Sequence, residues 1–280
     1  AVKLPKGDAG TAVELRAIRR SESPRLRFVG DALEAGAGAD EEEDGDEDPN
    51  SAAELHWQIG RAGDDADAAR HGWAKASVRD AACSLLGRLA QQSAFHQLRT
   101  VEQLGYVADA GADAQAGVIG LRCAVQSASN SPLALEERIE AWLALFRSQV
   151  EAMPETELFE KRAGLADLLT QRSSSLGDVV ARDWSEISSK RLSFSHAAKR
   201  AVAVRTLTKQ HLLQLLDTHV VIGAPERRLL RARVFAPGLA DAAGGTGALR
   251  SFSAVEAFKS TLEKWQPPVR YGEPGAPVVP

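Results

Sequence analysis

The sequence predicts an α+β domain in which helices pack on one face of a mainly antiparallel sheet. Three observations lead to this fold class. One segment alternates strictly between apolar and polar residues, several others repeat apolar residues every three to four positions, and the two kinds follow a definite order. That order is two strands, a helix, two strands, several helices and a final strand.

The composition is that of a globular protein large enough to bury a sizeable core, with 280 residues of which 44% are hydrophobic and 26% charged. No apolar run approaches the roughly 20 residues that a membrane-spanning helix needs, so we expect no membrane association. The two cysteines, Cys83 and Cys123, cannot form a disulfide framework, which favours reduced thiols inside a cell. The expected compartment is the cytoplasm, with an organelle as the alternative.

The net charge of −4 is distributed unevenly. Residues 40–48, DEEEDGDED, hold eight of the 38 acidic residues, and the rest of the chain has 34 basic residues against 30 acidic ones. The cationic excess does not cluster with aromatic residues or glycines, as it would in a nucleic-acid-binding domain. We therefore exclude nucleic acid as a partner. Because the chain starts with Ala rather than Met, we expect a fragment or a processed product.

Four regions follow one another along the chain. Residues 1–20 contain an N-terminal strand, and residues 21–50 form a low-complexity, acidic insertion that we expect to be a disordered loop. The core domain spans 51–236, and residues 237–280 are a Gly/Pro-rich C-terminal extension. The insertion is either a solvated loop or a docking element for basic peptides, since clustered carboxylates raise the local concentration of cations.

The first two strands differ in the strength of their signal. Residues 52–60 alternate cleanly, and the apolar positions of one face are Ala53, Leu55, Trp57 and Ile59. That pattern indicates a half-buried strand. Residues 12–20 read as a shorter strand. We expect the two to pair through a connection that the insertion lengthens, because the entropy of loop closure grows only slowly with length.

A long helix and two further strands are predicted next. The helix begins at Ser77 and continues to Arg99, with an apolar face made of Val78, Ala82, Leu85, Leu86 and Leu89. Residues 105–111 and 117–127 follow as strands. In the second strand the alternate apolar residues share one face with Cys123, which we interpret as a core thiol rather than a nucleophile.

A helical block and a last strand complete the core. Apolar residues recur at helical spacing at Leu135, Ile139, Trp142, Phe146 and Val150. Pro154 opens another helix, whose first turn holds two glutamates where the helix dipole favours acids. Further helices are expected around 176–190 and 208–219, the latter capped by Thr208, before a strand at 228–236.

The stretch FHQLRTVEQLGY, residues 95–106, brings a cation and a phenol to a sharp change of direction. Thr100 to Gln103 fits a capping box, so we expect the helix to end near Arg99 and a short capped turn to follow. A glycine then releases the chain into a strand at Tyr106. This geometry would hold a guanidinium and a phenol near one another at the end of the sheet.

Two interpretations of this corner stay open on physical grounds. Two donors held on rigid elements, the Arg99 guanidinium and the Tyr106 hydroxyl, suit a substrate carbonyl or a developing oxyanion. Phe95 lies four residues before Arg99 on the same helix face and would anchor it by packing. Alternatively, Arg99 caps carbonyls at a helix C-terminus and Tyr106 packs within the fold.

The same stretch closely resembles a motif of the insulin-degrading enzyme (insulysin) type of inverted-motif zinc metallopeptidases. That motif runs Phe-x-x-Leu-Arg-Thr-x-Glu-Gln-Leu-Gly-Tyr, and every fixed letter is present at 95–106. The resemblance continues through GVIGLRCAVQS at 117–127 and VRTLTKQHLL at 204–213, and into the tail sequence EAFKSTLEKWQPP. It covers 52–236 well and 1–20 weakly.

The resemblance implies a clamshell of two halves, each built from two related α+β domains, which encloses a chamber for unfolded peptides. The zinc site would lie in the first domain, and this chain looks like the last. By the same resemblance, Arg99 would orient the substrate backbone and Tyr106 would donate a hydrogen bond to the tetrahedral oxyanion. Phe95 and Gln103 would support this pair.

The histidine pattern supplies no zinc site of the His-x-x-Glu-His kind. No two histidines lie three or four residues apart, as one helical face would require; they are at positions 56, 71, 96, 196, 211 and 219. We therefore expect zinc to be bound by a domain that this chain does not contain. The expected partners are that N-terminal zinc-bearing half, from the same gene or a separate chain, and peptide substrates.

Two functions are consistent with these features. The first is the C-terminal, non-zinc domain of an insulysin-like zinc metalloendopeptidase, inactive by itself. The second is a non-catalytic binding or assembly module of the same family that lacks a zinc half. In either case a domain that normally lines a chamber would expose apolar surface when isolated, so we expect the isolated chain to associate with itself.

Overall fold

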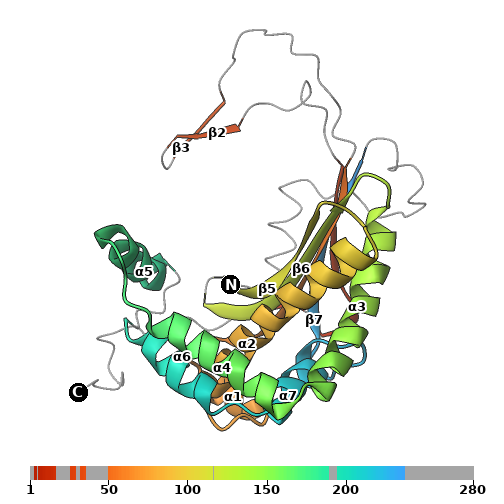
Figure 1. Cartoon of the computed structure of the whole chain (residues 1–280). Coiled ribbons are helices and arrows are strands. Elements are labelled where there is room, and N and C mark those ends of the chain that lie inside the picture. Colours follow the sequence, from red (N-terminus) through yellow and green to blue (C-terminus); the bar gives the residue numbers. More distant parts are fainter. Residues whose placement is uncertain are drawn as a thin grey trace.

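The structure is a computed structural model, and it describes residues 3, 4, 6–16, 26–29, 32–35, 50–115, 117–188 and 194–236. The largest sheet of the described residues has five strands in the order β1-β7-β4-β6-β5, and Figure 1 labels its strands β5, β6 and β7. The pairs β7–β4, β4–β6 and β6–β5 are antiparallel, and β1 joins β7 in parallel. The α+β fold class is therefore confirmed. The strands span β1 (Gly7–Arg16), β4 (Ser51–Arg61), β5 (Val107–Gln115), β6 (Val118–Ser127) and β7 (Arg228–Phe235).

One face of the central strands carries the core, as their alternating pattern predicts. Leu55 and Trp57 of β4 are buried and lie opposite Cys123 and Leu121 of β6. Burial raises the pKa of the Cys123 thiol, which keeps the sulfur protonated. Its interpretation as a core thiol is confirmed. The second cysteine, Cys83, is buried as well, and burial raises its pKa to about 12.

The predicted pairing of the two N-terminal strands is wrong. β1 begins at Gly7, five positions before the expected start at residue 12, and residues 17–20 lie outside the described residues. It pairs with β7, which lies between β1 and β4 in the sheet. A strand more than 200 residues further along the chain, at Arg228–Phe235, therefore takes the neighbouring position. Local alternation does not reveal such a long-range partner.

Parts of the two low-complexity regions fall outside the described residues. Within the predicted insertion, β2 (Leu26–Val29) and β3 (Ala32–Ala35) form a two-stranded antiparallel sheet. The acidic run 40–48 and the extension 237–280 are not among the described residues, so their character stays a prediction.

Helices pack on the core face of the sheet, where α2 contacts β5 and β6 while α3 contacts β4 and β7 (Figure 1). The helices predicted from apolar spacing are present; Pro154 opens α4 and is its N-cap, and Thr208 is the N-cap of α7 as expected. Two short helices, α1 and α6, were not predicted from the sequence. The helices span α1 (Asp65–Arg70), α2 (Ala76–Ala94), α3 (Pro132–Ala152), α4 (Glu155–Thr170), α5 (Leu176–Ser188), α6 (His196–Arg205) and α7 (Lys209–His219).

Helix α5 stands apart from the sheet in Figure 1 and leaves its apolar stripe uncovered by the described residues. The stripe recurs at helical spacing, and Trp184 within it is 64% exposed. Its members are Leu176, Val180, Trp184 and Ile187. Exposed apolar stripes promote association, so self-association of the isolated chain stays our prediction.

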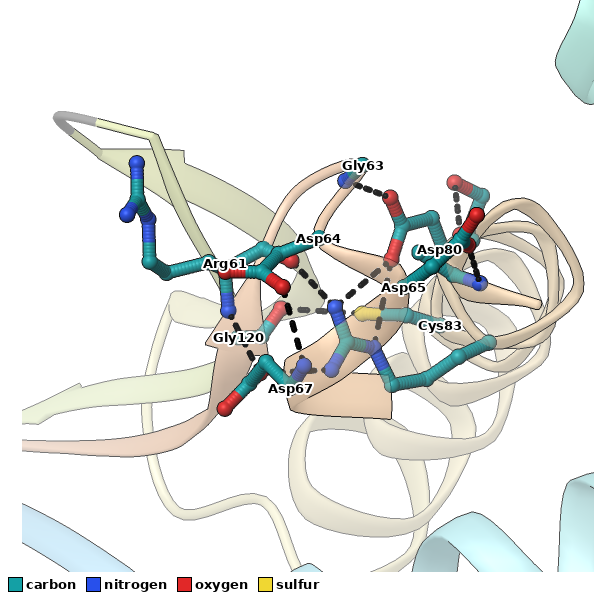
Figure 2. Close-up of polar contacts among 11 residues, drawn as sticks. Arg61, Gly63, Asp64, Asp65, Asp67, Asp80, Cys83 and Gly120 are labelled. Atoms are coloured by element: carbon teal, nitrogen blue, oxygen red, sulfur yellow. Dashed lines mark hydrogen bonds and ion pairs between the residues drawn. The ribbon is translucent and has the colours of Figure 1, made fainter. Parts of the chain in front are cut away.

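A buried ion cluster joins the start of α2 to the end of β4 and to α1 (Figure 2). The side chain of Arg79 is fully buried, and its Nη1 lies 2.7 Å from the Asp67 carboxylate. The same guanidinium contacts Asp80 at 3.3 Å and donates a hydrogen bond to the Arg61 carbonyl. Burial raises the pKa of Asp80, and the adjacent Arg79 opposes that rise. A Cβ at Gly60 would lie 2.4 Å from the Asp67 carboxylate, so a side chain at this position would displace the buried cluster.

At the end of α7, His219 is buried without a hydrogen-bond partner for either ring nitrogen among the described residues. Its ring packs edge-on against His71, with the centroids 5.1 Å apart. Burial, with smaller contributions from His71 and Arg79, lowers the pKa of His219 to about 3, against opposing effects of Glu226 and Asp67. The neutral imidazole is therefore the form that the fold accepts.

Acidification is expected to destabilise the fold through His219. In the unfolded chain its pKa is near 6.5, so below that pH the unfolded state binds a proton that the folded state does not take up until about pH 3. The stability is thus complete above pH 6.5 and is lost as the pH falls, by up to roughly 1.4 kcal/mol per pH unit. Urea unfolding at about pH 7 and pH 5.5 measures the loss. His219→Phe should reduce it, the exposed-site variant His96→Gln should not, and equal losses in all three chains would exclude His219 as the cause.

Candidate functional site

The backbone after α2 widens into a π-helix, Phe95–Val101, before it turns into the sheet. The amide of Glu102 donates to the carbonyl of Gln97 over 2.9 Å, and the amide of Leu104 donates to the carbonyl of Leu98 over 3.0 Å. These bonds reach back five and six residues, further than α-helical bonds do. The helix is therefore unwound where the corner begins. Short π-helical turns often occur at functional sites.

At this corner a guanidinium lies within 5 Å of the centres of two aromatic rings. The Cζ atom of Arg99 is 4.7 Å from the centroid of the Phe95 ring and 4.5 Å from that of the Tyr106 ring. Both distances are in the range of cation–π attraction. Tyr106 is 81% exposed and Phe95 46% exposed, so both rings reach the surface, whereas Arg99 is half-buried. The trio of Phe95, Arg99 and Tyr106 is called the Arg–Tyr corner below.

These observations remove the alternative in which Tyr106 packs within the described fold, because its ring is largely exposed. They also give no support to Arg99 as a helix cap. Among the hydrogen bonds of the described residues, none runs from Arg99 to a helix carbonyl. The sequence thus predicted correctly that the side chains of Arg99 and Tyr106 lie near one another.

Gly105 fixes the path of the chain through Tyr106 to the start of β5 at Val107. A Cβ at this position would lie 1.8 Å from the carbonyl oxygen of Gln126, closer than any real contact. Only glycine lets the chain pass this near to β6, and Val107 then pairs with Gln126 in the sheet. Glycine is therefore needed at this position because two backbone segments approach closely, and not because the residue adopts an unusual φ.

The predicted capping box is wrong. Thr100 lies inside the π-helix, which continues to Val101, instead of capping a new turn. Gln103 adopts the left-handed conformation, with φ 52°, and is exposed. No hydrogen bond of the described residues joins Gln103 to the Arg–Tyr corner. Its predicted supporting role therefore stays a prediction.

Glu102, which sequence reasoning did not single out, braces the corner instead. Its carboxylate accepts one hydrogen bond from Gln97 Nε2 over 2.9 Å and another from Arg138 Nε over 2.6 Å. The hydrogen bond from Arg138 is the main reason that the pKa of Glu102 is lowered. The contact ties the end of the π-helix to α3. Its partner lies 36 positions away in the sequence, so no local motif announces it.

The described residues do not fit a zinc site. Among them, no group of three or more histidine, cysteine, aspartate or glutamate side chains is placed to hold a metal ion. His211 caps the start of α7 and His219 is buried at its end. In the part of the chain that the structure describes, no helix combines the length and apolar character needed to cross a membrane.

Comparison with known proteins places these features in context. A family model described as "PQQ synthase PqqF-like, C-terminal lobe domain 4" matches residues 85–184. The chain is 31% identical over 151 residues to the peroxisomal insulin-degrading enzyme-like 1 of Arabidopsis thaliana, which is 54% of this chain and 16% of that protein. It is 31% identical over 153 residues to human insulin-degrading enzyme, 54% of this chain and 15% of that protein.

The chain therefore spans about a sixth of the length of these curated relatives. Among solved structures, pitrilysin shares the fold with a TM-score of 0.57 and 21% sequence identity. That match covers 77% of this chain and 22% of pitrilysin.

Proposed function

Because the chain belongs to the pitrilysin/insulysin-like (M16) peptidase family, as a domain of the C-terminal type, we propose that it is the non-zinc domain of a zinc endopeptidase that degrades peptides in a closed chamber. The family consists of zinc peptidases, whereas the described residues of this chain hold no metal-binding group. Zinc would then be bound by another domain of the complete enzyme, which would supply the metal chemistry.

The observation that carries the proposal is the exposed Arg–Tyr corner. A guanidinium with several N–H donors can hold a peptide carbonyl in place. A phenolic hydroxyl can donate one hydrogen bond to the oxygen on which negative charge develops during hydrolysis. In this proposal Arg99 orients the substrate backbone and Tyr106 stabilises the oxyanion.

The surroundings of the corner suit that role. The ring of Phe95 lies 4.7 Å from the Arg99 carbon, and cation–π attraction restricts where the guanidinium can point. Gly105 and the Glu102–Arg138 contact hold the backbone on either side of the turn. Gln103 lies within that turn and would support it through its left-handed conformation. Preorganised donors stabilise a transition state better than mobile ones.

The proposal is tested by comparing this chain with the complete polypeptide that contains it. We expect the complete protein to bind zinc and hydrolyse unfolded peptides, and the 280-residue chain alone to do neither. Metal analysis and a fluorogenic peptide assay give the two readouts. Peptide hydrolysis by the isolated chain would contradict the proposal. A complete protein that neither binds zinc nor hydrolyses peptides would favour the alternative, a non-catalytic binding or assembly module. The absence of a metal-binding group among the described residues is consistent with that alternative as well.

A further inference from the structure

Strand β5 is the last strand of the sheet, and none of the described strands pairs with its outer edge. Its sequence, VADAGADAQ, contains none of the lysines or prolines with which natural edge strands are commonly protected. Its two acids do not guard the edge, since Asp109 pairs with Arg122 and Asp113 lies 3.2 Å from His56. Both acids thus contact neighbouring strands. The other side chains of β5 are small, and α2 lies against the strand at Ala112, where a Cβ on Gly87 would come within 2.2 Å of the Ala112 amide nitrogen.

A cavity of about 360 Å³ runs beside this edge. Residues 109–112 of β5 form one wall, and helix residues that include Arg88 and Leu165 form the others. From the remaining strands of the sheet, only Arg122 of β6 reaches it, opposite Gly111 in the register. The cavity therefore opens on the side of β5 that has no strand neighbour.

The charge of this cavity is positive. Arg88 of α2, Arg122 of β6 and Arg200 of α6 line it, and Asp109 is the acidic residue among the lining side chains. Arg200 is directed towards α2, where its Nη1 donates to Ser84 Oγ over 3.2 Å. Arg88 is exposed and has no ion-pair partner among the described residues. Arginine clusters of this kind recognise carboxylates through charge-assisted hydrogen bonds.

We propose that an extended peptide binds along the outer edge of β5 as an additional strand, with one of its carboxylates held by Arg88 and Arg200. An open strand edge supplies main-chain hydrogen bonds to such a peptide, and an adjacent pocket selects a side chain. The inference rests on the proposed function, because it names the class of substrate for the same peptidase. That class is peptides with an acidic side chain or a C-terminal carboxylate at a set distance from the cleaved bond.

The position of the cavity sets that distance. Tyr106 immediately precedes β5, and residues 109–112 follow it by three to six positions. A strand rises about 3.4 Å per residue, so the arginines lie roughly 10–20 Å along β5 from Tyr106. A peptide bound at the edge would place its carboxylate about three to six residues from the peptide bond beside Tyr106.

Fluorescence anisotropy with the full 280-residue chain tests the binding directly. The probe is the labelled, end-blocked peptide Thr-Val-Thr-Ser-Glu-Ser-Thr-Val-Thr, and the matched probe has Gln in place of Glu. A third probe has Gln and a free C-terminal carboxylate, which distinguishes the two sources of the carboxylate. We expect at least one acidic probe to bind roughly tenfold or more tightly than the neutral probe, with the preference weakening at high salt. Equal binding of all three would overturn the inference.

Two further comparisons separate charge recognition from strand addition. Arg88→Gln, at an exposed position, should remove most of the preference for the acidic probe, and Arg200→Gln should do the same. Arg70→Gln, an exposed arginine on α1 that does not line the cavity, should keep it. An acidic probe methylated on every backbone nitrogen should bind at least roughly tenfold more weakly, because neither of its edges can then donate main-chain hydrogen bonds to β5. Undiminished binding of that probe would refute the added strand.

This assay reads binding without turnover, so it fails independently of the proposed function. Tyr106→Phe should change the affinity for the acidic probe by no more than about twofold, since the ring remains and only a hydroxyl is lost. Equal binding of all probes by a chain whose complete enzyme is active would reject the edge site alone. If the chain discriminated between the probes but the complete protein had no peptidase activity, the edge site would be supported and the proposed peptidase function would be rejected.

Discussion

Tyr106→Phe should lower kcat of the complete enzyme by roughly 10–1000-fold, the effect expected for the loss of one oxyanion donor. The substitution keeps the ring that stacks on Arg99 at 4.5 Å and removes only the hydroxyl. Tyr106 is 81% exposed, so the loss of the hydroxyl should leave the stability of the fold unchanged. Steady-state hydrolysis of a fluorogenic peptide measures the effect. KM should change little, because the hydrogen bond forms mainly in the transition state.

A control for this experiment is Trp184→Phe, which removes the polar group of another exposed aromatic residue, on α5. Its kcat should remain within about twofold of wild type, since surface changes away from a site have small effects. A wild-type kcat for Tyr106→Phe would remove Tyr106 from the mechanism. An increase in KM at unchanged kcat would instead assign Tyr106 to substrate binding.

Arg79→Met should reduce the free energy of unfolding by about 3–5 kcal/mol, the cost of breaking a buried ion pair by removing one partner. Asp67 and Asp80 are nearly as buried as Arg79 and would lose their counter-charge together. The carbonyl of Arg61 would lose the hydrogen bond from Arg79 as well. Urea unfolding at neutral pH, followed by circular dichroism, measures this change in the free energy of unfolding.

Two companion variants define the origin of this loss. Arg138→Met breaks the pair with Glu102 at the surface, where Arg138 is 49% exposed, and should cost less than about 1 kcal/mol. Combining Arg79→Met with Asp67→Asn and Asp80→Asn should recover part of the stability, because no buried charge is then left unpaired. A loss below about 1 kcal/mol for Arg79→Met would show that the cluster contributes little.

Elements with a strong local period could be predicted from the sequence. β4 is buried at every second residue from Ala53 to Ile59, and α3 is buried along the face that begins at Leu135. In each case the burial of one face imposes the period that the sequence displays. The contact between Phe95 and Arg99 follows in the same way, because residues four apart share a helix face.

Features that depend on distant partners could not be predicted. The sequence of β1 alternates too weakly to reveal where the strand begins and ends. Its pairing with β7 is established only when the whole sheet assembles. The cluster around Arg79 spans 12 positions to Asp67, and the brace on Glu102 spans 36. Thr100 fits a capping box by residue type, but the chain continues as a π-helix through Val101 before Gly105 passes close to Gln126.

A double-mutant cycle on kcat of the complete enzyme tests most directly whether the Arg–Tyr corner acts on a substrate as one unit. The four proteins are wild type, Arg99→Gln, Tyr106→Phe and the double variant. In the proposed mechanism Arg99 positions the substrate on which the Tyr106 hydroxyl acts, so the two effects should be coupled, and the double variant should be little slower than the slower single variant. The account would be contradicted if the two single variants raised the activation free energy by amounts that simply add in the double variant. A kcat at the wild-type level in all four proteins would contradict it as well.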